Sequence, residues 1–269
     1  MSSVTFRART VLSAIKGNLA AWRFWRQQPD NDFTRNGYEI IPGVLDAATC
    51  DRLIDLGESL LDDHSYRIDG DCYLSVRAER GIVGDSQVRA IMNINLVDDG
   101  VAELMASRTV QSLYEDRLRV GVEVRGFSLQ VDGVDTKTKR DFHVDGLYPP
   151  VFKAFIYLTD VTEDGEGPYT IIPGSHRHYA RKLANDVRNA LRHGDRRRDM
   201  GSFIPRDRAS KVLAPRGTMI LSTQDSIHKG WQDHWKSPRF ALIAHATTAA
   251  QFARDGGGPL TTGLDRLRR

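Results

Sequence analysis

Cysteine is scarce in this 269-residue sequence, which contains only Cys50 and Cys72. So few cysteines argue against a disulfide scaffold and are typical of a protein that folds in a reducing compartment. The sequence has no apolar run long enough to cross a bilayer, and its N-terminus lacks the apolar core and cleavage site of a signal peptide. The formal net charge of +3 gives no basis for nucleic-acid binding. We therefore expect a soluble, cytoplasmic protein that binds no nucleic acid.

Acidic residues are absent from residues 1–29, whereas five basic residues occur there: Arg7, Arg9, Lys16, Arg23 and Arg26. Four apolar residues in the same segment recur at spacings of three and four: Val11, Ile15, Leu19 and Trp22. Together these patterns predict a basic amphipathic helix. Two interpretations of residues 4–26 stay open. Basic and aromatic side chains suit a membrane surface, but most amphipathic helices in soluble proteins cover a core, so packing on the domain or on a partner subunit is favoured.

The segment that follows residue 29 combines one short strand with two helices. The sequence YEII predicts a strand at residues 38–41, which Pro42 and Gly43 end. Leucine periodicity predicts a helix from about Ala47 to Leu61, with Asp46 as its N-cap. A second helix is expected at residues 101–116.

From residue 120 onward the pattern changes to short segments rich in β-branched and aromatic residues, separated by Gly, Pro and Asp. They are residues 120–131, 151–161, 169–173, 217–222 and 239–248. This arrangement is typical of an antiparallel sandwich or jelly roll, and helices would be supplied by the N-terminal part. The fold class that we expect is mostly β with flanking helices.

The sequence DFHVDG at residues 141–146 places a histidine and an aspartate two positions apart. On a strand, residues i and i+2 point to the same face, so His143 and Asp145 can aim an imidazole and a carboxylate at one point. They would supply two of the three ligands of a 2-His-1-carboxylate site, which leaves coordination positions open for a cosubstrate and dioxygen. The alternatives are a surface strand pair without metal and a zinc site.

A third ligand must come from one of the later histidines, which are His176, His178, His193, His228, His234 and His245. The first three lie in a basic segment, where like charges oppose a cation. His228 directly follows the predicted strand 217–222 and stands eleven positions before Arg239, which opens the next strand. We therefore choose His228 as the third ligand. Arg239 would bind a carboxylate through its planar guanidinium, a role that a zinc hydrolase does not need.

Four motifs in the right order now carry a family resemblance: FTRNGYEIIPGVLD, FHVDG, YLTDVTEDGEGPYTIIPGSHR and HKGWQDHWKSPR. From about Asp32 to Thr248 the chain resembles the phytanoyl-CoA dioxygenase-like group of Fe(II)/2-oxoglutarate-dependent oxygenases. The resemblance implies a double-stranded β-helix (jelly roll, cupin-like) core. It also implies a reaction of 2-oxoglutarate and O2 that yields succinate and CO2 and hydroxylates a small-molecule substrate.

Carried onto this sequence, the resemblance implies that His143, Asp145 and His228 bind Fe(II) and that Arg239 binds the far carboxylate of 2-oxoglutarate. Gln130 matches a position where related enzymes contact the cosubstrate through an amide. Lys153 has the strand parity to face the same pocket. Many members have Gln between the His and the Asp, whereas this chain has Val144. Related halogenases lack the carboxylate, so Asp145 favours a hydroxylase.

The resemblance also suggests a division of the chain. The N-terminal helix would occupy residues 1–29, the dioxygenase domain residues 30–250, and a flexible tail residues 251–269. A basic insertion at residues 176–211 is either a lid that attracts an anionic substrate (phosphorylated, carboxylated, or linked to CoA or a carrier) or a solvated helical face. The other function class is a non-catalytic jelly-roll binding protein that keeps its metal site. Substrate identity and oligomeric state stay open.

Overall fold

The structure is a computed structural model of the whole chain. It describes residues 3–62, 67–69, 72–78, 87–132, 142–145, 150–193, 205–229 and 236–260.

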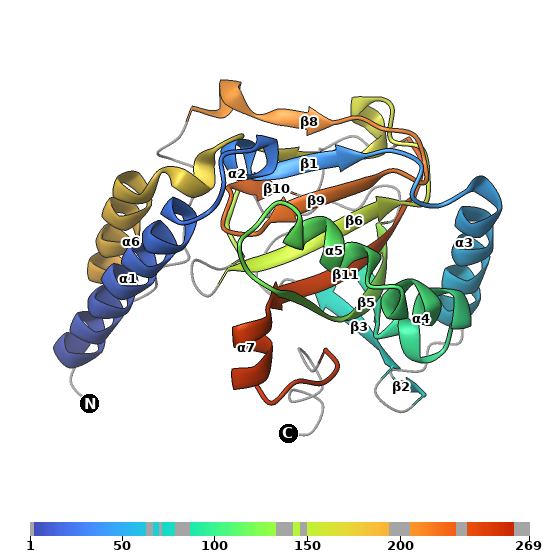
Figure 1. Cartoon of the computed structure of the whole chain (residues 1–269), viewed down its shortest axis with the longest axis horizontal. Coiled ribbons are helices and arrows are strands. Elements are labelled where there is room, and N and C mark those ends of the chain that lie inside the picture. Colours follow the sequence, from blue (N-terminus) through green and yellow to red (C-terminus); the bar gives the residue numbers. More distant parts are fainter. Residues whose placement is uncertain are drawn as a thin grey trace.

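Two antiparallel sheets form the body of the molecule (Figure 1). The strands are β1 (Tyr38–Ile41), β2 (Arg67–Asp69), β3 (Cys72–Ala78), β4 (Gln87–Met92), β5 (Val122–Asp132), β6 (Val151–Tyr157), β7 (Tyr169–Ile171), β8 (Ser210–Val212), β9 (Met219–Thr223), β10 (His228–Lys229) and β11 (Arg239–Thr248). The large sheet has the order β1-β9-β6-β11-β5-β4-β3-β2, and the small sheet has the order β10-β7-β8. The predicted mostly-β jelly roll is confirmed.

Helices flank the large sheet. They are α1 (Ser3–Arg26), α2 (Asp32–Asn36), α3 (Ala47–Asp62), α4 (Asp99–Ala106), α5 (Thr109–Glu115), α6 (Tyr179–His193) and α7 (Ala249–Arg254). Successive side chains of β6 point to opposite faces of the large sheet, so this strand contributes to two hydrophobic clusters. Phe152 and Ile156 join the main core, which also includes Leu53 of α3 and Tyr114 of α5. Tyr157 points the other way and packs with residues of β7 and β8. The space between the two sheets is therefore lined by the second set of side chains.

Strand and helix bounds follow the sequence closely where the pattern is strong. Strands β1 and β11 have the predicted limits, and α3 ends one residue beyond Leu61. The Asp46 carboxylate accepts a hydrogen bond from the Thr49 N–H at 2.7 Å, as an N-cap does. The continuous helix expected at residues 101–116 is wrong. It is broken into α4 and α5 because Arg108 adopts a left-handed φ of 56°.

The segment after β11 folds back onto the domain. Residues 249–254 form α7, and Leu260 is buried against Met92. The Asn93 side chain fixes this contact because it bonds both the N–H and the carbonyl of Leu260 at 2.9 Å. Residues 249–260 thus contain a helix and a buried leucine, and residues 261–269 of the predicted flexible tail lie outside the described part.

Helices α1 and α6 pack against each other and project from the sheets as an arm (Figure 1). They run antiparallel, since Asn18 donates to Asp186 at 2.9 Å while Trp25, one to two turns later, lies near the start of α6. The face of α1 that packs is not the apolar stripe expected. Its buried residues are Ala14, Asn18, Ala21 and Trp25, whereas Ile15, Leu19 and Trp22 are exposed.

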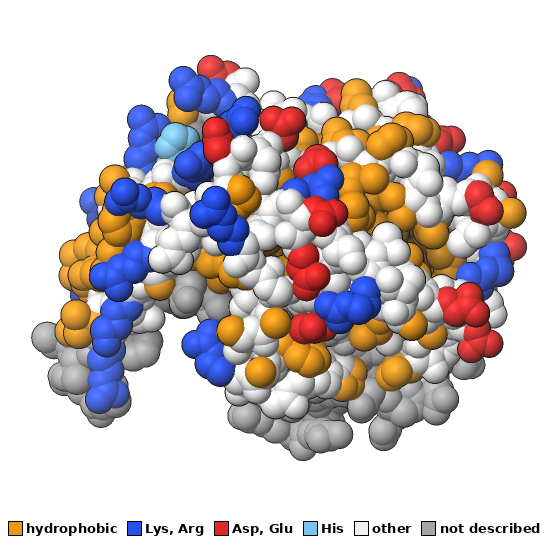
Figure 2. All heavy atoms as spheres, in the orientation of Figure 1, with side chains coloured by type: hydrophobic (Ala, Val, Ile, Leu, Met, Phe, Trp, Pro, Cys, Tyr) orange, Lys and Arg blue, Asp and Glu red, His pale blue; other side chains and the backbone are white. Residues whose placement is uncertain are grey.

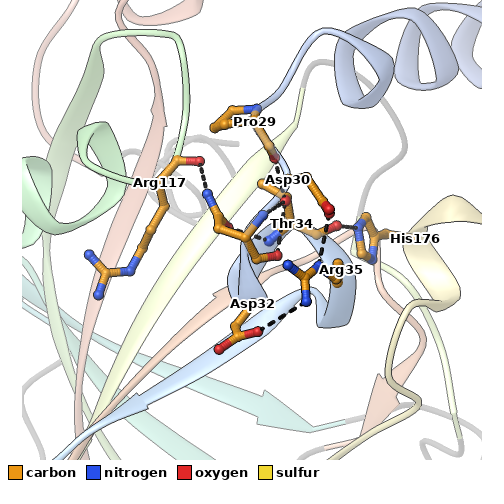
Figure 3. Close-up of polar contacts among 8 residues, drawn as sticks. Pro29, Asp30, Asp32, Thr34, Arg35, Arg117 and His176 are labelled. Carbon is orange, nitrogen blue, oxygen red and sulfur yellow. Dashed lines mark hydrogen bonds and ion pairs between the residues drawn. The ribbon is translucent and has the colours of Figure 1, made fainter.

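Short polar contacts fix the root of this arm where α1 gives way to α2 (Figure 3). Thr34 and Asn31 form a capping box, and the Thr34 hydroxyl donates to the Pro29 carbonyl at 2.6 Å. The Asn31 amide donates to the Arg117 carbonyl at 2.9 Å, and a ring nitrogen of His176 lies 3.0 Å from the Thr34 carbonyl. The root of the arm is thus attached to the turn after α5 and to the short 3-10 helix after β7.

Candidate metal centre

His143 lies opposite His228, the first residue of β10, across an isolated antiparallel bridge. Each backbone N–H donates to the other residue's carbonyl at 2.9 Å. Two residues on, the Asp145 N–H donates to the Gln224 carbonyl at 2.9 Å, which fixes the end of this segment against the turn after β9. Backbone pairing, rather than the side chains themselves, therefore brings together residues 85 positions apart in the chain.

The side chains of His143, Asp145 and His228 converge as the sequence predicts. The Nε2 atom of His143 is 3.5 Å from Asp145 Oδ1, and the Nε2 atom of His228 is 4.0 Å from Asp145 Oδ2. One ligand atom from each residue lies within 4.8 Å of the other two, which is the spacing of groups that share a metal ion. Val144 instead packs against Phe142 and its apolar neighbours, as the strand alternation requires.

The surroundings of His228 prepare it to bind a cation. Its Nδ1 lies 2.9 Å from the Ser226 carbonyl, an acceptor that requires a proton on Nδ1 and leaves the lone pair on Nε2 toward Asp145. Burial, reinforced by the neighbouring His143, lowers the pKa of His228 to about 3. The imidazole is therefore neutral at physiological pH, which is the form that binds metal. The donor set of two imidazoles and one carboxylate fits a divalent ion with open positions.

Lys153 lies on the inner side of β6, as its parity predicts, but its observed partner is Asp145. The two side chains form an ion pair with Nζ 2.6 Å from Oδ2. A carboxylate has two oxygens, so this ammonium can orient Asp145 while the carboxylate also binds a metal. The predicted contact of Lys153 with 2-oxoglutarate stays a prediction.

Arg239 is buried at the start of β11 and is held by a carboxylate of β5 and by a backbone carbonyl that precedes β7. Its Nη2 is 2.5 Å from Asp132 Oδ2 on β5, and its Nη1 donates to the Gly167 carbonyl just before β7. Gly167 lies two residues before Tyr169, and the ring of Tyr169 lies 5.6 Å from the ring of the predicted metal ligand His228. Arg239 and His228 therefore both lie close to the segment of residues 167–169.

Gln130 also lies against Asp132, with its amide nitrogen 3.0 Å from Oδ2. Arg239 and Gln130, which the resemblance assigns to binding 2-oxoglutarate, therefore both contact the buried carboxylate of Asp132. Sequence reasoning missed Asp132, although its place two residues after Gln130 on the same strand face was a usable signal. The carboxylate holds the guanidinium plane in position, and any acidic ligand of Arg239 must share it with Asp132.

A second buried ionic group that the sequence did not reveal supports the turn before His228. Asp225 is fully buried, and its carboxylate accepts hydrogen bonds from Trp25 Nε1 at 2.7 Å and from the Thr223 hydroxyl. The buried Lys182 of α6 donates to the Asp225 carbonyl at 2.7 Å. Asp225 therefore joins the arm, through Trp25 and Lys182, to the turn that precedes the predicted ligand His228.

Among the other candidate histidines with described side chains, His176, His178 and His245 lie apart from the triad, and the side chain of His193 is not among those described. His176 is fully buried between Trp25 and the Thr34 carbonyl, so its imidazole is directed away from the triad into the root of the arm. The imidazole of His245 lies 2.8 Å from the Ser128 hydroxyl within the large sheet. His178 lies beside Trp22 in a hollow at the root of the arm. His234 lies outside the described residues, and so do Tyr148 and Trp231, which we consider candidates for the substrate pocket.

Gly37 permits the close packing beneath this centre. It adopts φ +82°, and a Cβ there would collide with the Ser226 hydroxyl and lie 2.7 Å from His176 Nδ1. Gly43 also has positive φ but open space around it. We expect Gly37→Ala to destabilise the protein by about 1–3 kcal/mol more than Gly43→Ala, measured by urea denaturation, since only the first adds overpacking to backbone strain. Equal losses would contradict this account of the turn.

A family comparison matches most of the chain. The model described as phytanoyl-CoA dioxygenase (PhyH) matches residues 33–241. The chain belongs to the phytanoyl-CoA dioxygenase family. A comparison with curated proteins found no match.

Solved structures of similar fold agree with this family. The carbocyclase SnoK from nogalamycin biosynthesis, described as non-heme and α-ketoglutarate dependent, is 18% identical with a TM-score of 0.57 and covers 90% of this chain and 92% of its own. The epimerase SnoN, in complex with Fe3+, α-ketoglutarate and nogalamycin RO, is 17% identical (TM-score 0.54; 86% and 84% covered). HygX from Streptomyces hygroscopicus, with nickel and 2-oxoglutarate bound, is 16% identical (TM-score 0.54; 81% and 85% covered).

At these identities the likeness shows the fold. Family and fold together indicate iron- and 2-oxoglutarate-dependent oxygenase chemistry for the phytanoyl-CoA dioxygenase family member described here. None of the helices in the described ranges is long and apolar enough to span a membrane.

Proposed function

We propose that this chain is an Fe(II)- and 2-oxoglutarate-dependent dioxygenase that hydroxylates a C–H bond of a small-molecule substrate. The observation that carries the proposal is the convergence of His143, Asp145 and His228 in an interior that also contains the buried cation Arg239. A binding protein without turnover would not need open coordination positions on the metal. It also would not need Arg239, a buried cation that can bind the carboxylate of a cosubstrate.

Each side chain has a distinct part in this proposal. His143, Asp145 and His228 hold the metal on one side, so that the remaining positions serve the cosubstrate and O2. The Ser226 carbonyl orients His228, and the Lys153 ammonium orients Asp145. Arg239 grips the far carboxylate of 2-oxoglutarate, with Gln130 beside it. When bound, the metal and 2-oxoglutarate supply O2 activation coupled to release of succinate and CO2.

The choice of hydroxylation rests on Asp145. A carboxylate ligand occupies the position that a halide takes in related halogenases, so halogenation is disfavoured. SnoN and SnoK are described as an epimerase and a carbocyclase, so this fold serves more than one outcome. The anionic character of the substrate stays a prediction from the sequence, since Arg196, Arg197 and Arg198 lie outside the described residues.

The charges of the site predict that metal and cosubstrate bind as a pair. Among the described residues around it, the cations Arg239 and Lys153 are matched by the carboxylates Asp132 and Asp145. A dication or a dianion bound alone would leave two uncompensated charges in a buried space, whereas together they cancel. We therefore expect 2-oxoglutarate to bind at least about tenfold more tightly when Fe(II) is present, and the reverse.

An anaerobic titration with Fe(II) and 2-oxoglutarate tests this proposal through the visible charge-transfer band of the chelate. Arg239→Lys keeps the charge that compensates Asp132 but loses the planar fork. It should raise the KM for 2-oxoglutarate by at least about tenfold and change the metal Kd by less than about threefold. An unchanged KM would falsify the assigned role of Arg239. Binding without succinate release on any substrate would favour the non-catalytic alternative.

A further inference from the structure

The outer side of α1 carries an apolar stripe that the rest of the described structure leaves uncovered. Its members are large hydrophobic residues on one helix face, with the following exposed fractions: Leu12 56%, Ile15 41%, Leu19 43% and Trp22 36%. We call these four residues the outer stripe. Single exposed hydrophobic residues are common, but four in a row along one helix indicate an interaction surface.

The exposure of the outer stripe does not result from poor packing of α1. A neighbouring face of α1 is buried through Ala14, Asn18, Ala21 and Trp25, so the helix already has its packing partner in α6. The contacts at Asn31, Thr34 and His176 fix the root of the arm to the domain. The outer stripe is therefore exposed on a helix whose orientation is set by its buried face and by the contacts at its root.

The charges beside the stripe all have one sign. Residues 1–29 contain no Asp or Glu, and Lys16, Arg23 and Arg26 are exposed on α1. The acid within α6, Asp186, is fully buried against Asn18. Hydrophobic and basic side chains accordingly lie next to each other along the arm in Figure 2. This surface complements a partner that is apolar underneath and negatively charged at its boundary.

Two shallow hollows border the stripe, and basic residues line both. The first is lined by Lys16, Leu19, Ala20, Arg23, Phe24 and Gln27. The second lies at the root of the arm and is lined by Trp22, Arg177, His178, Tyr179, Ala180 and Arg181. Trp22 stands between apolar and charged surroundings, since the Arg26 guanidinium lies 4.8 Å from its ring centroid. An indole in such a place suits a membrane–water interface.

We propose that the outer stripe of α1 binds the surface of an anionic phospholipid bilayer. Leu12, Ile15, Leu19 and Trp22 would enter the boundary between headgroups and acyl chains, while Lys16, Arg23 and Arg26 contact phosphates. A second copy of the chain fits less well, because paired stripes would bring two basic rows together without an exposed acid on the described arm to offset them. This surface is separate from the metal centre and does not depend on the proposed reaction.

Flotation of the full-length protein with unilamellar vesicles tests the proposal. The protein should float with phosphatidylcholine vesicles that contain about 30% phosphatidylglycerol at about 0.05 M NaCl, and much less with pure phosphatidylcholine or at about 0.5 M NaCl. Lys16→Glu/Arg23→Glu should weaken binding at least about tenfold. Arg119→Glu/Arg254→Glu makes the same charge change on the main domain at exposed positions and should leave binding within about twofold.

The apolar contribution has its own matched pair. Leu12→Ser/Leu19→Ser should abolish flotation, whereas Leu96→Ser/Leu213→Ser removes leucines of similar exposure from the main domain and should have no effect. Brominated lipids should quench the fluorescence of the wild-type protein more than that of Trp22→Phe, since Trp22 would lie in the interface. No flotation with anionic vesicles at low salt would overturn the proposal. So would a dimer in sedimentation velocity that the Leu12/Leu19 variant dissociates.

Discussion

Asp145→Ala is expected to lower turnover by more than about 1,000-fold, through loss of the metal rather than loss of the fold. Asp145 is the anionic member of the triad, and its removal has a second consequence. The Lys153 ammonium, now paired with Asp145 at 2.6 Å, would face the metal position without its carboxylate. A cation within a few ångströms opposes a dication strongly in a partly buried site, so metal affinity should fall further than loss of one ligand implies.

Metal content after anaerobic reconstitution, together with succinate release, measures this effect. Val144→Ala is the matched control, because the neighbouring side chain points into the apolar cluster around Phe142 and should affect turnover little. Asp145→Ala/Lys153→Met separates the two causes, since removing the ammonium should restore part of the metal affinity but not the turnover. One equivalent of iron and turnover within about tenfold of wild type in Asp145→Ala would show that the carboxylate is not a ligand.

The parts of the structure that the sequence predicts are those fixed by local pattern. Strand β11 and helix α3 have strong periodicity, and their limits agree with the prediction within one residue. His143 and Asp145 could be paired because strand alternation is a local rule. His228 could be chosen because it directly follows a predicted strand. The strands β2, β3 and β4 were not predicted, since their short segments mix apolar residues with Arg, Asp and Ser and show no clear period.

The buried ionic groups escaped prediction for a different reason. Asp132, Lys182 and Asp225 are charged, and a charged residue taken alone is expected at the surface. Their burial depends on partners far away in the chain, such as Arg239 for Asp132 and α1 for Asp225. The outer stripe of α1 shows the converse. The sequence pattern includes Ile15, Leu19 and Trp22 but has Val11 in place of Leu12, and only the position of α6 reveals which face of the helix is covered.

Lys182→Met is expected to destabilise the folded protein by about 3–5 kcal/mol at neutral pH, although Met fills similar space. Burial lowers the pKa of Lys182, while Asp225 and Asp186 oppose that shift. Burial likewise raises the pKa of Asp225, and Lys182 is the strongest influence in the other direction. Without the ammonium, two fully buried carboxylates would lose their nearby cation.

The pH dependence of this loss has a definite sign. A carboxyl whose pKa is raised by folding is protonated in both states below its unfolded value of about 4, so the missing cation then matters little. As pH rises, the unfolded carboxyl ionises while the folded one resists, and the stability of Lys182→Met falls relative to wild type. Urea denaturation at several pH values between about 4 and 8 should show a growing gap.

Lys16→Met provides the matched lysine control, because Lys16 is exposed and its replacement should change stability by less than about 0.5 kcal/mol. Lys182→Met/Asp225→Asn should recover part of the loss, since it removes one buried charge together with its partner. Lys182→Met also tests whether this buried ionic group supports the metal centre. Asp225 fixes the turn that positions His228 through Trp25 and Thr223, so Lys182→Met should also weaken Fe(II) binding, and more at high pH than at low pH. A pH-independent loss, or one equal to that of Lys16→Met, would mean that Lys182 does not stabilise Asp225.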